Sequence, residues 1–303
     1  MAQFRTRKVP LDGVLLIDKP AGATSHDVVA RVRRLLRPTV KKVGHAGTLD
    51  PFATGLLVVL VGRATKLARF FVDLPKEYEC TVKFGVRSDT GDLTGKLVET
   101  GVTTTRDAVA EVLPDFVGMI MQSVPMTSAV KVDGERLYKK AHRGEVVETP
   151  VKKVEIESIE ILDFDADAQA MRCRIACSKG TYVRQLAIDI GEAVGAGGHL
   201  EQLARTATGD LSLDDAQTLA EFEQAVTTRE PGDEHIPGLL PPSAALQFMP
   251  ALELSAAQVT AVRNGARLPG GPPEPVRLVF RGELIAIYGP AEEGHALKLL
   301  VKL

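Results

Sequence analysis

The sequence predicts an α+β protein: a mostly antiparallel mixed sheet flanked by helices, followed by a small, mainly β C-terminal domain. Strand-like alternation of apolar residues occurs over 78–84 and 171–177, and helical periodicity occurs over 28–36 and 183–190. These patterns do not follow a strict βαβ order, which argues against a parallel doubly wound sheet. With 303 residues and 45% hydrophobic content, the chain can bury a core in one large domain or two unequal ones.

The N-terminal part begins with a short strand, a turn at Pro20–Gly22 and a helix, in "LLIDKPAGATSHDVVARVRRLL". Ser25 is the expected N-cap, and Asp27 adds a favourable negative charge to the first helical turn. "LLVVLVG" (56–62) is typical of a buried strand, and "ATKLARFFVD" (64–73) predicts a helix after it.

The middle of the chain contains the two alternating segments. Tyr78 shares one face with three residues that point to the core, namely Cys80, Val82 and Phe84. "MRCRIACSKG" (171–180) alternates in the same way, and "TYVRQLAIDIGEAVG" (181–195) predicts a helix that starts after an N-cap at Thr181.

Residues 221–242 are acidic and rich in Pro and Gly, so we expect a linker there. Beyond it, "ELSAAQVTAVRNGARL" predicts a short helix ending at Asn264–Gly265, followed by a hairpin and a last strand. We therefore expect one domain over 1–245 and a second over 250–303.

Composition excludes several classes of protein. The apolar run at 56–61 is too short to cross a bilayer, and the N-terminus has no apolar signal segment, so we expect a cytoplasmic protein without a membrane partner. The three cysteines form no C-x-x-C pair and the six histidines show no ligand spacing, so we expect neither a metal site nor disulfides. The net charge is −2, yet residues 1–45 hold ten Lys and Arg against three Asp, which permits a local basic face.

The segment "GHAGTLDPFATGLL" (44–57) places one carboxylate, Asp50, on a glycine-rich bend before a buried strand. Asp before Pro is also a common turn or helix-start signal, and from this segment alone that structural interpretation stays open. No second acid at fixed spacing, Ser–His–Asp order, P-loop or GxGxxG pattern accompanies it.

Six segments, taken in order, resemble one known family. They are "DKPAGATSHD", "GHAGTLDPFATGLL", "GRATK", "KEYEC", "SKGTYVRQLAIDIG" and "GGHLEQLARTATG". Together they closely resemble the bacterial TruB-type tRNA pseudouridine synthases, well over residues 11–210 and loosely beyond. The resemblance implies a pseudouridine-synthase fold and isomerisation of uridine-55 in the T-loop of tRNA, with no cofactor.

The resemblance also implies roles for individual residues. Asp50 matches the catalytic aspartate, which acts either as a nucleophile or as a base. Arg184 matches the arginine that pairs with it, and Tyr78 matches the tyrosine that stacks on the target base and assists proton removal from C5. Without the resemblance, Tyr78 is a core-facing strand residue and Arg184 an exposed surface cation.

Three further positions match residues that bind the substrate. Tyr182 and Leu203 correspond to residues lining the base site, and His45 to a histidine that helps to hold the T-loop with the base turned out. From sequence alone, Leu203 is equally a core residue and His45 a turn-capping imidazole. The glycines around Asp50 are expected to let the loop approach the substrate closely.

The segment 124–152 resembles the family's RNA-clamping insertion, and 250–303 a reduced PUA-like RNA-binding domain. The expected phosphate contacts of the insertion are Lys131, Arg136, Lys139, Lys140 and Arg143. A merely solvated charged surface is the alternative for each. The implied partner is the T-arm of tRNA, bound by a monomer. Two other interpretations stay open: an RNA-folding module with vestigial chemistry, and a guide-RNA-dependent relative acting on ribosomal RNA.

Overall fold

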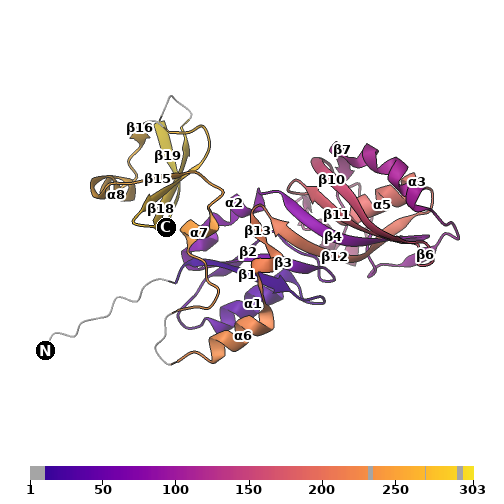
Figure 1. Ribbon diagram of the computed structural model, residues 1–303, viewed down its shortest axis with the longest axis horizontal. Helices are drawn as coiled ribbons and strands as arrows, with labels where there is room; N and C mark the ends of the chain where they lie inside the picture. Colours follow the sequence, from indigo (N-terminus) through magenta and orange to yellow (C-terminus); the bar gives the residue numbers. More distant parts are fainter. Residues whose placement is uncertain (1–10, 231–234, 270, 292–295) are drawn as a thin grey trace. The chain divides into compact units, whose positions relative to one another are not determined.

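The computed structural model describes residues 11–230, 235–269, 271–291 and 296–303 (Figure 1). The chain divides into two compact units. The first contains the residues up to 50, those from 56 to 72 and those from 209 onward, and the second contains 51–55 and 73–208. Strand pairing is mostly antiparallel, with parallel pairs between β1 and β14 and between β3 and β12, so the predicted α+β class with a mixed sheet is confirmed.

The first unit contains the sheet order β14-β1-β3, with β2 paired to β3. Its elements are β1 (Gly13–Lys19), α1 (Ser25–Leu35), β2 (Val43–Ala46), most of β3 (Thr54–Val61), the 3-10 helix η1 (Gly62–Leu67), α2 (Ala68–Val72), β13 (Leu211–Ser212), η3 (Leu213–Asp215), β14 (Gln217–Thr218), α6 (Leu219–Thr227) and α7 (Pro242–Ala245). Helices α1 and α6 lie side by side (Figure 1), and the Arg31 guanidinium donates from Nε to Glu223 at 3.2 Å. The predicted stripe of α1 is confirmed, because Val28, Val29 and Val32 are buried.

The second unit contains the sheet order β12-β4-β11-β10-β7. Its elements are β4 (Lys76–Phe84), β5 (Val86–Ser88), β6 (Leu97–Glu99), α3 (Arg106–Val112), the 3-10 helix η2 (Leu113–Phe116), β7 (Gly118–Ser123), β8 (Lys131–Val132), β9 (Glu135–Arg136), α4 (Leu137–His142), β10 (Val151–Asp165), β11 (Ala170–Cys177), α5 (Val183–Ala193) and β12 (Gly198–Thr208). Cys80 on β4 faces Cys173 on β11, and all three cysteines are buried with free thiols. The α5 stripe, including Leu186 and Ile190, packs towards β12.

Residues 251–302 form a separate five-stranded sheet in the order β15-β17-β18-β19-β16. Its elements are β15 (Ala251–Glu253), α8 (Ala256–Arg263), β16 (Leu268–Pro269), β17 (Val276–Phe280), β18 (Glu283–Pro290) and β19 (Ala296–Lys302). The predicted helix end at Asn264, the hairpin and the last strand are all confirmed. A cluster of buried apolar residues, including Val262, Leu278 and Tyr288, gives this sheet a core of its own.

Two predicted elements are wrong in part. The segment expected to be a linker begins with α6, because Thr218 and Glu221 form a capping box that starts a helix despite the acidic composition. The helix expected over 64–73 starts as the 3-10 helix η1 and becomes α-helical only at Ala68. No helix of the described residues is both long and apolar enough to cross a membrane.

Candidate active site

Asp50 lies in the loop between β2 and β3 and is half-buried. The residue before it is held from the start of α1. The Ser25 hydroxyl accepts a hydrogen bond from the Leu49 amide at 2.9 Å and donates one to the Leu49 carbonyl oxygen at 3.0 Å. Ser25 is only 2% exposed, so both bonds are shielded from water. The backbone next to Asp50 is therefore anchored to a helix.

This role for Ser25 corrects the predicted N-cap. The cap of α1 is Thr24, which forms a capping box with Asp27: the Asp27 amide donates to the Thr24 hydroxyl at 3.0 Å, and the Thr24 amide donates to the Asp27 carboxylate at 2.9 Å. The Asp27 carboxylate also accepts a hydrogen bond from the Thr24 hydroxyl at 2.6 Å, and this bond, together with the one from the Thr24 amide, lowers the pKa of Asp27. The two adjacent hydroxyl residues therefore have different roles: Thr24 caps the helix, and Ser25 holds the backbone of the Asp50 loop.

The glycine that follows the Asp50 loop is required by packing. Gly55 has φ of +97°, and a Cβ placed there would lie 2.4 Å from the carbonyl oxygen of Arg205, its partner on β12. Gly55 therefore has a packing role that the sequence did not predict: it allows the backbones of β3 and β12 to approach closely. Gly47, with φ of +91°, provides the left-handed turn that ends β2.

Lys19, at the end of β1, places a buried cation in the same unit as Asp50. Its side chain is fully buried, and Nζ donates to the carbonyl oxygens of Pro20 at 2.9 Å and Ala23 at 2.7 Å. Burial lowers the pKa of Lys19 to about 8, and the charge of Asp50 is the largest of the effects that oppose this shift. Lys19 thus braces the turn before α1 and contributes positive potential at Asp50.

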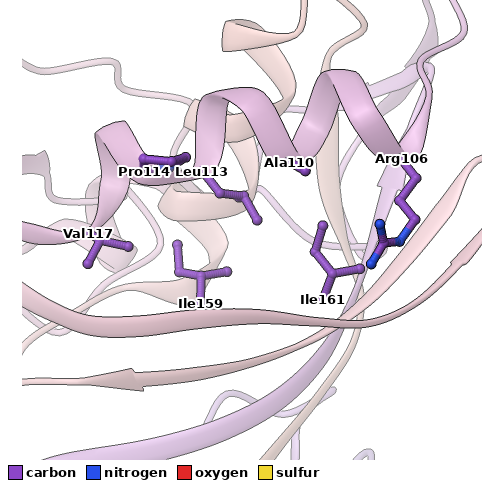
Figure 2. A pocket seen from close by; sticks show the side chains of 7 residues that line it. All are labelled: Arg106, Ala110, Leu113, Pro114, Val117, Ile159 and Ile161. Carbon is purple, nitrogen blue, oxygen red and sulfur yellow. The ribbon is translucent and has the colours of Figure 1, made fainter.

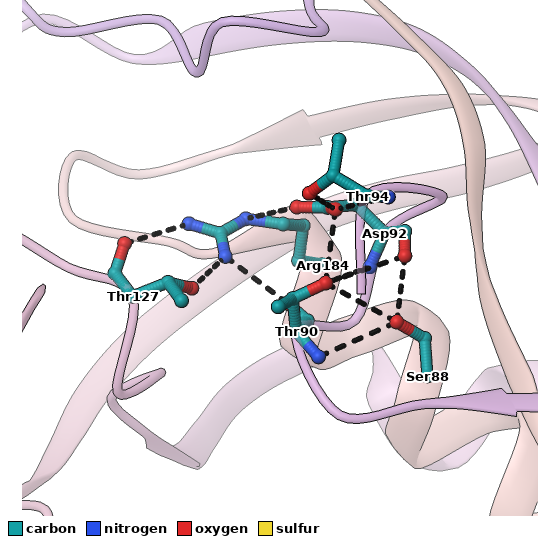
Figure 3. Close-up of polar contacts among 6 residues, drawn as sticks. All are labelled: Ser88, Thr90, Asp92, Thr94, Thr127 and Arg184. Atoms are coloured by element: carbon teal, nitrogen blue, oxygen red, sulfur yellow. Dashed lines mark hydrogen bonds and ion pairs between the residues drawn. The ribbon is translucent and has the colours of Figure 1, made fainter. Parts of the chain in front are cut away.

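Arg184 lies in the first turn of α5 and is 4% exposed, so its interpretation as a surface cation is wrong. Figure 3 shows its guanidinium surrounded by residues of two loops. Nε lies 3.7 Å from a carboxylate oxygen of Asp92, Nη1 donates to the Thr90 carbonyl oxygen at 3.1 Å and to the Thr127 hydroxyl, and Nη2 donates to the Thr127 carbonyl oxygen at 3.3 Å. These contacts fix the plane of the guanidinium.

Asp92 is a buried partner of Arg184 that the sequence did not predict. It is 4% exposed, and its carboxylate accepts hydrogen bonds from the Thr90 hydroxyl at 2.9 Å and the Thr94 amide at 2.9 Å. The run "SDTGDLT" (88–94) is rich in turn-forming residues, and from sequence it indicates a loop and no more.

The predicted N-cap of α5, Thr181, is also wrong. Tyr182 occupies the N-cap position without a side-chain cap, while the Thr181 hydroxyl donates to the Ser178 carbonyl oxygen.

Tyr78 and Leu203 lie on the neighbouring strands β4 and β12, where Leu203 is opposite Cys80. Leu203 is 7% exposed, whereas Tyr78 is half-buried, in contrast to Cys80 and Val82 on the predicted core face. Tyr182, at the start of α5, is held by Gln122: its amide donates to the Gln122 side-chain oxygen at 2.7 Å, and the Gln122 amide group donates to the Tyr182 carbonyl oxygen at 3.1 Å.

The second unit thus contains Tyr78, Tyr182, Arg184 and Leu203, and the first contains Asp50 and His45. His45 is half-buried on β2, opposite Val59 of β3. The pairing of Asp50 with Arg184 stays a prediction, as do the roles of the other candidate residues.

Two of the five predicted phosphate contacts of the insertion form ion pairs with acidic residues of the same insertion. Arg143 forms a bidentate pair with Glu135 at 2.7 and 2.8 Å and a further pair with Glu145 at 2.7 Å, while Lys140 lies 3.6 Å from Asp133. The other three predicted contacts are exposed and make no ion pair within the described part of the chain: Lys131, Arg136 and Lys139.

A hollow of about 560 Å³ lies between α3, η2 and β10 and contains none of the predicted site residues (Figure 2). Its lining is apolar except for Arg106, and it offers no carboxylate for acid–base or nucleophilic chemistry.

In the described ranges, no group of three or more His, Cys, Asp or Glu is arranged to hold a metal ion.

Comparison with solved structures supports the predicted fold. A chain in the "Cbf5-Nop10-Gar1 Complex" matches with a TM-score of 0.75 and 26% identity, over 96% of this chain and 84% of that one. A chain in the "archaeal box H/ACA sRNP Nop10-Cbf5 complex" matches with a TM-score of 0.73 and 25% identity, over 97% and 86%.

Curated relatives are more similar in sequence. Proteins named tRNA pseudouridine synthase B from Dechloromonas aromatica and Cupriavidus metallidurans are 43% and 44% identical, covering 96% and 94% of this chain and 96% and 88% of their own lengths. The family model for the N-terminal domain of TruB family pseudouridylate synthases matches residues 33–183, and that for the tRNA pseudouridylate synthase B C-terminal domain matches 184–247. Such matches define an RNA-modifying isomerase. The chain belongs to the TruB family of pseudouridylate synthases.

Proposed function

We propose that this enzyme converts uridine-55 in the T-loop of tRNA to pseudouridine. The observation that carries the proposal is the 43% identity, over 96% of both chains, with a relative named tRNA pseudouridine synthase B. The structural neighbours from Cbf5 complexes are only 25–26% identical. This difference favours bare tRNA as substrate over an RNA presented by a guide.

The reaction is an isomerisation in which no atoms are gained or lost. The N1–C1′ bond breaks, the uracil turns, a C5–C1′ bond forms, C5 loses its proton and N1 gains one. Because no outside acceptor such as water is consumed, a pair of acids of the kind that glycosidases use is unnecessary. A single carboxylate suffices, and no cofactor is expected.

Asp50 is the proposed catalytic residue. It acts either as a nucleophile that captures a sugar or base intermediate, or as a base that removes a sugar proton. Arg184 is its proposed partner, since a guanidinium beside a carboxylate favours the ionised form on which both routes depend. Ser25 and Lys19 support this role from within the first unit, because they fix the backbone and raise the potential at Asp50.

A uridine stacked within an RNA loop must be turned out before its glycosidic bond can be reached. Tyr78 is proposed to stack on the turned-out base and to assist removal of the C5 proton. Tyr182 and Leu203 are proposed to line the base site, and His45 to hold the loop from which the base has left. Stacking and shape recognition of this kind are typical of RNA loops.

The remaining contacts involve the tRNA backbone. Lys131, Arg136 and Lys139 are the strongest proposed phosphate ligands, because Lys140 and Arg143 must first exchange acidic partners. We further propose a catalytic domain over 1–245, with its clamping insertion over 124–152, and a reduced PUA-like domain over 250–303 that contacts the tRNA. The expected enzyme is a cytoplasmic monomer.

The test is to incubate the purified full chain with an unmodified tRNA transcript and to map pseudouridine position by position. The proposal predicts modification at position 55 without any guide RNA. A transcript with cytidine at position 55 is the matched control and should stay unmodified. Modification elsewhere, or only when a guide is added, would overturn the proposal. Improved tRNA refolding without any modification would instead favour an RNA-folding module.

A further inference from the structure

Thr127 joins the clamping insertion to the candidate arginine. Its hydroxyl accepts a hydrogen bond from Nη1 of Arg184, and its carbonyl oxygen accepts one from Nη2 at 3.3 Å (Figure 3). Thr127 lies three residues after Val124, whose amide donates to the Pro150 carbonyl oxygen at 3.0 Å and closes the base of the insertion. The insertion therefore contributes a side chain and a backbone group to the surroundings of Arg184.

The same stretch is also tied to the basic helix of the insertion. The carbonyl oxygen of Ser128 accepts from the Tyr138 amide at 3.0 Å, and that of Val130 accepts from the Leu137 amide at 2.8 Å. Leu137 is fully buried, so the start of α4 is packed as well as hydrogen-bonded. A continuous set of contacts thus runs from α4, which carries Lys139, through Ser128 and Thr127 to Arg184.

The guanidinium that Thr127 contacts is enclosed within the protein. Arg184 is 4% exposed, so bulk water does not readily replace a lost acceptor. Asp92 and Thr90 also contact the guanidinium, at Nε and Nη1, whereas Thr127 contacts Nη1 through its hydroxyl and Nη2 through its carbonyl oxygen. Removing the hydroxyl while leaving the carbonyl would loosen the orientation of the guanidinium without removing its charge.

We propose that Thr127 is a positioning residue: from its place in the RNA-clamping insertion, it orients Arg184 for the reaction. This inference rests on the proposed function, because it assigns Thr127 a role through Arg184. It predicts that the Thr127 hydroxyl acts on turnover and hardly at all on tRNA binding.

The experiment compares Thr127→Val, which keeps the shape and removes the hydroxyl, with Thr127→Ser, which keeps the hydroxyl. Turnover is followed by release of tritium from C5 of labelled uridine in a tRNA transcript, and tRNA affinity by filter binding. Thr149→Val is the matched control, because Thr149 lies in the same insertion and its hydroxyl makes no hydrogen bond in the described part of the chain. Thr127→Ala serves as a second hydroxyl-free variant.

We expect Thr127→Val and Thr127→Ala to lower kcat about tenfold, the size of a lost hydrogen bond to a charged group, with KM and tRNA affinity within about twofold of wild type. Thr127→Ser and Thr149→Val should stay within about twofold in every measurement. Equal turnover in Thr127→Val and Thr149→Val would overturn the inference alone, as would a Thr127→Ser variant as slow as the valine variant. An inactive wild type would overturn the proposed function and this inference with it.

Discussion

Asp50 and Arg184, the two central candidates, differ in how far they are buried. Asp50 is half-buried on a loop, and hydrogen bonds with Ser25 fix the backbone of the residue before it. Arg184 is 4% exposed on a helix, and its guanidinium itself is held by Asp92, Thr90 and Thr127. A group that must reach a substrate atom keeps its side chain accessible, whereas a group that acts through another residue can be enclosed.

This contrast predicts that substitutions around Arg184 and around Asp50 affect stability and turnover to different extents. Changes around Arg184 should alter stability strongly, because a buried charge depends on its partners. Changes around Asp50 should alter stability less and turnover more, because the anchor there positions a loop.

The largest effect on stability is expected from Asp92→Asn. It removes the described anion of a buried ion pair, so the free energy of unfolding should fall by about 3 kcal/mol, with a loss of turnover. Urea denaturation measures the change. Asp89→Asn is the matched control, because Asp89 is exposed and accepts one bond from the Lys96 amide. A loss in Asp92→Asn no greater than that in Asp89→Asn would contradict the view that Arg184 depends on enclosed partners.

A pH-dependent effect is expected from Lys19→Met. The pKa of Lys19 is about 8 in the folded protein, against an ordinary value of 10.5 in the unfolded chain, so the folded state loses its proton first as the pH rises. The stability of wild type relative to Lys19→Met should therefore increase between about pH 8 and pH 10.5, by up to about 3 kcal/mol.

Urea midpoints at several pH values test this expectation. Lys42→Met, at an exposed lysine, should show no such increase relative to wild type. If the difference in stability between wild type and Lys19→Met is the same at every pH from 8 to 10.5, the Lys19 ammonium does not have a lowered pKa in the folded protein.

The smallest of the three stability effects is expected from Ser25→Ala. It leaves the buried Leu49 amide without its partner, which should cost about 1–2 kcal/mol. Turnover should fall as well, because the backbone before Asp50 is released, while tRNA affinity should be unchanged. Ser123→Ala, at an exposed serine, is the control. If Ser25→Ala loses stability but keeps full turnover, the bonds to Leu49 are structural only.

The sequence allowed the class of fold to be predicted because its signals are local. Alternation at β4 and β11 and the apolar stripes of α1 and α5 each depend on residues a few positions apart. Capping was harder: at Thr24–Ser25 two adjacent residues could cap, and only the structure shows which one is recruited by Leu49.

The site was predictable where a short motif carries the residue and not where contacts are long-range. Asp50 stands in a distinctive segment, whereas Asp92 and Thr127 contact Arg184 across 92 and 57 positions in the chain. No periodicity or spacing connects such residues in one sequence. The packing role of Gly55 was missed for the same reason, since its cause is the backbone of Arg205 on another strand.

The most direct test of the account is the rate of pseudouridine formation at position 55 by Asp50→Asn, measured in a single turnover with enzyme in excess over tRNA. No detectable product is expected from Asp50→Asn, which should keep a cooperative urea transition and wild-type tRNA affinity, while Asp73→Asn, at an exposed aspartate paired with Lys179, should react like wild type. Product formation by Asp50→Asn at the wild-type rate would show that Asp50 is not the catalytic residue.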